Sequence, residues 1–184
     1  MRYPPQETAE KRARILEQAS ILFREHGFSG VSVSEIMKAT GLTHGPFYNH
    51  FDSKEDLVSK SIADASTKAL DAMKVDASSG QTTAQFVDEY LSEEHRDDRG
   101  NGCVMAALAG EVAREPAAQG AFTRHVEAMV EAFAGPLAKA KKKNARRHAI
   151  HTLSSIVGAI VLARAVDNPQ FSEEILRETR AELD

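Results

Sequence analysis

The segment from Val31 to Lys54 constrains the fold of this chain most, because its helix boundaries can be read directly from the residues. Ser32 and Glu35 have the spacing of a capping box, in which each side chain binds the backbone N–H of the other residue at a helix start. Gly41 predicts the end of that helix, since glycine adopts the left-handed conformation at low cost. The spacing therefore predicts a short helix that begins at Ser32 and stops before Gly41.

A second short helix is expected directly after this turn. Thr43 can cap it. Pro46 suits its first turn, because backbone N–H groups there have no carbonyl partner within the helix and proline, which lacks an N–H, loses no hydrogen bond. Two short helices joined by a glycine turn form a helix-turn-helix, whose second helix usually enters the DNA major groove. A helical hairpin with a solvated polar face, in an unrelated bundle, is the alternative. The residues expected to contact DNA are Ser32, Thr43, His44, Gly45, Pro46, Tyr48, Asn49, His50 and Lys54.

The first third of the chain resembles the N-terminal DNA-binding domain of the TetR/AcrR family of transcriptional regulators. The resemblance runs without a gap through KRARILEQASILFREHGFSGVSVSEIMKATGLTHGPFYNHFDSKEDLV. Its most specific pieces are ILFREHGF, SVSEIMKATGL and FYNHFDSKEDL. Two positions depart from the commonest pattern: Met37 stands where a small residue is more usual, and Pro46 stands where threonine is common. The resemblance implies a dimeric regulator that binds operator DNA and responds to a small molecule.

Composition is compatible with this reading but does not single it out. The chain has 184 residues, a net charge of −4 and one cysteine, Cys103, which suits a reducing cytoplasm. Residues 1–60 carry eight basic and eight acidic side chains, so positive charge has to gather locally for the chain to bind DNA. No apolar run long enough to span a bilayer and no signal peptide is expected. Motifs of the common enzyme classes are absent, so we expect no enzyme, no cofactor and no metal site.

The rest of the chain predicts helices throughout, because apolar residues recur at helical spacing and alternating β-branched runs are absent. We expect an all-α protein of about nine helices, with a three-helix DNA-binding domain at residues 1–52 and a ligand-binding and dimerisation domain at residues 53–184. Outside the helix-turn-helix, the expected helices are Thr8–His26, Ser53–Met73, Thr83–Glu94, Cys103–Arg114, Pro116–Lys143, Arg146–Val166 and Ser172–Leu183.

The segment Ala149–Val166 is apolar around more than one face. Such a helix is either fully buried or shared with a second subunit. The family resemblance implies the second, with the last two long helices forming a four-helix bundle across a two-fold axis. We therefore expect a homodimer whose interface contains Leu153, Ile156, Val157, Ile160 and Val161.

The middle helices predict a pocket for a small apolar or aromatic effector, since they carry aromatic and methionine side chains with few charges. The expected lining is Phe86, Tyr90, Cys103, Met105, Leu108, Phe122, His125, Val126 and Met129. We therefore expect a cytoplasmic repressor, released from a palindromic operator by its ligand, with no membrane partner. Two alternatives remain: a helical small-molecule-binding protein without an operator, and a thiol-based sensor acting through Cys103.

Overall fold

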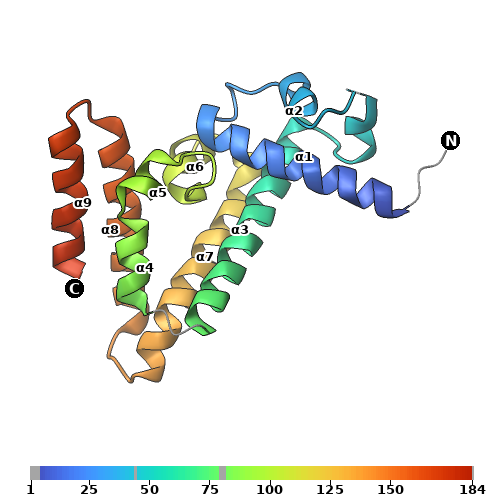
Figure 1. Cartoon of the computed structure of the whole chain (residues 1–184). Helices are drawn as coiled ribbons and strands as arrows, with labels where there is room; N and C mark the ends of the chain where they lie inside the picture. Colours follow the sequence, from blue (N-terminus) through green and yellow to red (C-terminus); the bar gives the residue numbers. More distant parts are fainter. Residues whose placement is uncertain (1–4, 44, 79–81, 184) are drawn as a thin grey trace.

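The computed structural model describes residues 5–43, 45–78 and 82–183, and within them it contains helices and no strand (Figure 1), which confirms the predicted all-α class. The helices are α1 (Pro5–His26), α2 (Val33–Ala39), the 3₁₀ helix η1 (Gly45–Asn49), α3 (Lys54–Ser78), α4 (Thr83–Tyr90), α5 (Glu93–Asp97), α6 (Val104–Val112), α7 (Pro116–Lys139), α8 (Ala145–Ala165) and α9 (Pro169–Leu183).

Several boundaries differ from the prediction for simple stereochemical reasons. α1 begins at Pro5 and α9 at Pro169, before the predicted Thr8 and Ser172, because proline is tolerated in the first turn of a helix. The single helix predicted for residues 83–94 is divided into α4 and α5. The Ser92 side chain accepts a hydrogen bond from the backbone N–H of His95 at 3.1 Å and so starts a new helix.

Helix α2 has the ends that its sequence predicts. The Ser32 hydroxyl accepts the N–H of Glu35 at 3.2 Å, and the Glu35 carboxylate accepts the N–H of Ser32 at 2.7 Å, which completes the capping box. Gly41 follows the helix with φ +69°, in the left-handed region. Arg14 of α1 donates a hydrogen bond to the carbonyl of Thr40, which ties the end of α2 to the first helix.

The second half of the helix-turn-helix is shorter and tighter than predicted. Thr43 does not begin an α-helix; instead a five-residue 3₁₀ helix, η1, follows over Gly45–Asn49. Phe47 and Phe51 are buried, with 0% and 1% exposure, and their ring centroids lie 5.6 Å apart. These two rings hold η1 against the core, while Tyr48 and Asn49 of η1 are exposed. We call the unit formed by α1, α2 and η1 the head.

The remaining helices, α4 to α9, form the body, and α3 connects it to the head. In Figure 1, α3 and α7 run side by side, α8 follows next to α7, and α9 forms the outer edge. Leu57, Val58 and Ile62 near the start of α3 belong to the core of the head. Leu70 and Met73, further along α3, pack against the core of the body. One continuous helix therefore contributes side chains to both cores and links them.

Helix α8 is, among the described residues, the one helix long and apolar enough to cross a membrane by length and composition alone, which the sequence analysis did not expect. Its inward face packs against α7 and α9. Arg164 near its end donates hydrogen bonds to the carbonyls of Arg96 and His95, at 2.7 and 2.8 Å. These contacts place α8 between α7 and α9 in a folded helical bundle.

Candidate DNA-binding surface and ligand cavity

Ser32, the first residue predicted to contact DNA, is exposed but has a structural role. Its hydroxyl accepts the Glu35 N–H and also lies 2.7 Å from Glu35 Oε2. The hydrogen bond from the Ser32 hydroxyl is the largest influence on the Glu35 carboxyl and lowers its pKa. Ser32 therefore fixes the start of α2 at the outer surface of the head.

The 3₁₀ helix η1 and the turn before it contain most of the residues predicted to contact DNA. Thr43 and Asn49 are exposed, and Tyr48 is 65% exposed, with its ring 5.0 Å from the buried Phe47 ring. Gly45 and Pro46 lie in the backbone of η1, whereas His44 falls outside the described residues. An exposed aromatic ring held by a buried one, next to exposed Thr and Asn side chains, is a surface suited to reading groove edges.

Cationic side chains from α1 and α3 gather beside η1, although the whole chain is acidic. The Arg12 guanidinium and the Lys60 ammonium each lie 5.6 Å from the centroid of the Phe51 ring. Burial lowers the pKa of His50, and the positive charges of Arg12 and Lys11 lower it further. Lys54, half-buried, is the first residue of α3. Two of these cations are paired with carboxylates, since Lys60 lies 2.6 Å from Asp56 and Lys11 lies 2.8 Å from Glu7.

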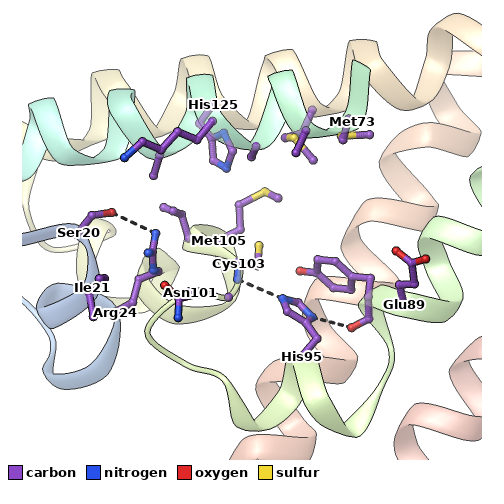
Figure 2. A pocket seen from close by; sticks show the side chains of 18 of the residues that line it. Ser20, Ile21, Arg24, Met73, Glu89, His95, Asn101, Cys103, Met105 and His125 are labelled. Carbon is purple, nitrogen blue, oxygen red and sulfur yellow. Dashed lines mark hydrogen bonds between the residues drawn. The ribbon is translucent and has the colours of Figure 1, made fainter. Parts of the chain in front are cut away.

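A second candidate site is a cavity of about 510 Å³ between the head and the body. It is lined by parts of α1, α3, α4, α5, α6 and α7 and by the segment between α5 and α6 (Figure 2). Six of the predicted pocket residues lie in its wall: Phe86, Tyr90, Cys103, Met105, His125 and Met129. The volume is in the range of pockets that enclose a drug-sized molecule.

Three predicted pocket residues do not line this cavity, because their helix faces point elsewhere. Leu108, 3% exposed, belongs to the core of the head. Val126 packs into the core of the body, and Phe122 packs against both cores. Each of the three lies on the same helix as a residue that does line the cavity. The prediction therefore chose the right helices but the wrong face of each helix at these positions. The spacing of apolar residues does not show which part of an apolar stripe faces empty space.

The polar side of the cavity was missed by the sequence analysis. Ser20 and Arg24 come from α1, which the sequence assigned wholly to the head, and Asn101 precedes α6. His95 Nδ1 lies 2.6 Å from the Tyr90 carbonyl, while its Nε2 accepts the Cys103 N–H at 3.2 Å. No sequence signal connects residues so far apart in the chain; only the packing of α1 against α3 and α6 brings them together.

His125 is the one predicted polar anchor that the structure places in the cavity wall. Its side chain is 2% exposed, and its Nδ1 lies 2.9 Å from the Ser66 hydroxyl. Burial lowers its pKa, so the imidazole is neutral around pH 7. Among the described residues no group of three or more His, Cys, Asp or Glu side chains is arranged to hold a metal ion.

A direct contact joins the head to the cavity wall through α6. The N–H of Phe28, just after α1, donates to Glu111 Oε2 at 2.6 Å, and Glu111 lies at the far end of α6 from Cys103. Gly27 has φ +75°, and a Cβ there would clash with the Glu111 carboxylate. Glycine therefore lets the carboxylate approach the backbone at this junction. The two ends of α6 touch the cavity and the head.

Most of the predicted dimer residues are buried within the chain itself. Ile156 and Ile160 are 0% exposed and Leu153 is 4% exposed, so none of them presents a surface to a partner. Val157 is half-buried, and Val161 is 41% exposed. The outward face of the last two helices carries four large apolar side chains, each exposed by 41% to 56%: Ile150, Val161, Leu162 and Phe171.

Comparison with known proteins finds close similarity in the head. Residues 15–60 match the family described as "Bacterial regulatory proteins, tetR family". The chain is 47% identical over 55 residues to the HTH-type transcriptional regulator AcrR of Shigella flexneri, which is 30% of this chain and 26% of that protein. It is 42% identical over 48 residues to the HTH-type transcriptional repressor KstR2 of Rhodococcus jostii, which is 26% of this chain and 24% of that repressor. The chain thus matches about a quarter of these relatives' length.

Solved structures resemble the chain over nearly its whole length. Reduced E. coli NemR superposes with a TM-score of 0.79 at 18% identity, covering 95% of both chains. A TetR transcriptional regulator from Chloroflexus aurantiacus gives a TM-score of 0.70 at 26% identity, with 97% of this chain and 96% of that chain covered. The similarity in the body is therefore one of fold, with little sequence identity.

Proposed function

Because the chain belongs to the TetR family of bacterial regulatory proteins, we propose that it is a DNA-binding transcriptional regulator of the cytoplasm. The observation that carries this proposal is the exposed surface beside a capped α2, formed by Thr43 before η1 and by Tyr48 and Asn49 on η1. The matched relatives include proteins named as repressors, so we propose repression rather than activation.

We propose that the head divides its contacts between bases and phosphates. Thr43, His44 and Tyr48 read the groove, while His50 and Lys54 contact phosphates. Arg12 is a third residue proposed to contact phosphates, since its guanidinium lies over the Phe51 ring beside η1. Phosphate contacts set the register of the head on the duplex, and groove contacts select the sequence.

We propose that two copies pair through the outward faces of α8 and α9. Four of the five large apolar side chains that are strongly exposed among the described residues lie on these helices, and the fifth is Tyr48 in the head. A Cβ added at Gly158, in the middle of α8, would meet no atom within 4 Å, so a partner helix can approach closely there. Large exposed apolar side chains gathered on two neighbouring helices favour an interface there. A two-fold dimer would present two heads to a palindromic operator.

Ligand binding in the cavity would act on the head by two routes. Helix α3 carries Lys54 at its first residue and Met73 in the cavity wall, so a ligand that displaces the wall displaces the phosphate contact. Helix α6 runs from Cys103 in the wall to Glu111, which holds the Phe28 N–H. Lowering operator affinity a hundredfold needs about 2.7 kcal/mol of coupling, within the usual range for allosteric proteins.

A thiol sensor is the second candidate, favoured by the position of Cys103 in the cavity wall. The two candidates share the operator-binding head and differ in whether the effector binds reversibly or reacts with sulfur. Recovery of operator binding after removal of the effector by dialysis separates them, since a covalent thioether would persist.

Selection from a random DNA library by the purified full-length protein tests the proposal. We expect enrichment of one palindromic sequence, and a gel shift with DNA from upstream of the chain's own gene. The Thr43→Ala variant should still bind but accept more than one base at a central position of each half-site. Failure to enrich any sequence over the starting library would contradict the proposed function and favour a helical ligand-binding protein without an operator.

A further inference from the structure

The two walls of the cavity differ in chemistry. Helices α3 and α7 contribute one wall, which is apolar apart from His125 and Lys68, and Figure 2 shows His125 and Met73 along it. The opposite wall in Figure 2 carries Ser20, Arg24 and Asn101 at one side and Glu89 at the other. A ligand that fills this space meets hydrocarbon on one face and hydrogen-bonding groups on the other.

Arg24 is the cation of the polar wall, and within the described residues it forms no direct ion pair. Its Nε donates to the Gly100 carbonyl at 2.6 Å and one terminal nitrogen donates to the Ser20 hydroxyl at 3.0 Å. Burial lowers the pKa of Arg24, and Cys103, Asp98 and Glu25 offset that lowering only in part. A guanidinium has five N–H donors, so this half-buried group keeps hydrogen-bonding capacity for an anion.

The Tyr90 hydroxyl is a second donor in the same wall, and in the empty cavity it is covered by protein atoms. The Tyr90 side chain is 8% exposed, and its hydroxyl makes no hydrogen bond of normal geometry within the described residues. The Cys103 thiol beside it is only a weak acceptor. Burial raises the pKa of Tyr90 well above its ordinary value, so the phenol keeps its proton. Arg24, Tyr90 and Cys103 all line this one cavity.

From these contacts we propose that the cavity takes an amphipathic organic anion. Its carboxylate or sulfonate group pairs with Arg24 and receives the Tyr90 hydroxyl, and its flat apolar body lies against Met73, Met129 and the alanines of α3. Charge-assisted hydrogen bonds to an oxyanion are stronger than neutral ones, so the anionic group sets the preference. The carboxylates at the cavity, Glu17 and Glu89, are exposed, and Glu89 lies away from Arg24 in Figure 2.

A regulatory role for the bound anion rests on the proposed function, in which the head binds DNA. Arg24 belongs to α1, the first helix of the head. An anion bound to Arg24 contacts the same helix that places Arg12 beside η1. The ligand would therefore act on the DNA-binding surface directly, in addition to the routes through α3 and α6.

Two fluorescent probes with the same aromatic body test the proposal. Anilinonaphthalene sulfonate carries the anion, and N-phenylnaphthylamine is the same body without it. We expect the full-length protein to bind the sulfonate at least about tenfold more tightly than the neutral amine, a difference of about 1.4 kcal/mol. Ala69→Phe, which fills the cavity, should abolish tight binding of both probes and so locate them there.

The Arg24→Met variant keeps the length and apolar stem of the side chain but removes the charge. We expect it to lose the preference for the sulfonate while binding the amine as before, and Arg24→Lys should restore most of the preference. Tyr90→Phe should weaken the sulfonate more than the amine. Folding of each variant is checked by its helical circular dichroism and melting curve.

Three results would overturn the proposal: equal affinity of the wild-type protein for the two probes, equal loss of both probes in Arg24→Met, or unchanged binding of both in Ala69→Phe. Operator binding is measured separately by fluorescence anisotropy without any probe. A protein that discriminates the probes but binds no operator contradicts the proposed function alone. A protein that binds its operator but does not discriminate the probes contradicts the anion assignment alone.

Discussion

The head and the body of this protein are related to known proteins in different ways. The head matches relatives in sequence, with 47% identity over 55 residues to one of them. The body matches in shape, since whole-chain superposition reaches a TM-score of 0.79 at only 18% identity. The contrast indicates that the head shares its sequence with the matched relatives, whereas the body shares a fold with the solved structures at little sequence identity. The identity of the effector therefore has to be argued from the body.

The physical origin of the contrast is the range of the interactions that build each part. The α2 end of the head depends on contacts between near neighbours, such as Ser32 with Glu35 and the left-handed Gly41. The cavity depends on residues far apart in the chain, such as Arg24 and Gly100, whose side-chain to backbone hydrogen bond is 2.6 Å long. The following predictions test whether this division is real.

The largest effect is expected from a charge in the core of the body. Ile160→Glu places a carboxylate at a position with 0% exposure and should lower the free energy of unfolding by more than about 4 kcal/mol. Leu162→Glu, two residues along and 56% exposed, should leave the chain folded but monomeric. Sedimentation and circular dichroism separate the two outcomes. A folded monomer for Ile160→Glu would show that the inward and outward faces of α8 have been confused.

The junction between head and body should give an intermediate effect. Glu111→Ala leaves the Phe28 N–H without its 2.6 Å acceptor and should lower the free energy of unfolding by about 1–3 kcal/mol. Glu111→Gln keeps an acceptor oxygen and serves as the control, with a smaller loss. Urea unfolding monitored by hydrogen exchange in each part provides the measurement. The test compares the urea concentrations at which the head and the body lose their protection from exchange. If the difference between these two concentrations is the same in Glu111→Ala as in the wild type, this contact does not couple head and body.

Equivalent caps in the two parts should give similar small effects. Ser32 and Thr82 each accept a backbone N–H, at 3.2 Å, in a complete capping box. Replacing either by alanine should lower the free energy of unfolding by about 1 kcal/mol. Only Ser32→Ala should also weaken operator binding, because α2 positions η1. Equal loss of operator affinity in both variants would contradict the separate role of the head.

The smallest effect concerns pH. Burial lowers the pKa of His125, so below its ordinary value of about 6.5 the unfolded chain binds a proton that the native chain does not. The free energy of unfolding should therefore fall as pH decreases below about 6.5. His125→Gln should reduce that slope, and His50→Gln, at a half-buried position in the head, should reduce it less. Urea titrations between pH 5 and 8 measure it; an identical slope in His125→Gln would show that this histidine does not titrate differently on unfolding.

The sequence predicted the fold class, the first helix of the helix-turn-helix and its glycine turn, because caps and left-handed glycines act within a few residues. It did not predict that η1 is a 3₁₀ helix, since the turn is shaped by the buried rings of Phe47 and Phe51. It placed Ile156 and Ile160 in a dimer interface because periodicity shows that a helix has an apolar face without showing what covers that face. Arg24 was missed as a cavity residue because only the packing of α1 against α3 and α6 brings it to the cavity.

Hydroxyl-radical protection mapping on the operator obtained by selection tests the central claim most directly. A dimer that places two η1 segments in the major groove should protect two symmetric half-sites, with centres about 34–36 Å apart or slightly more. The Leu162→Glu monomer should leave this pattern weak or absent at the same protein concentration. A single protected, non-palindromic site would contradict the account of a two-fold regulator whose heads bind DNA together.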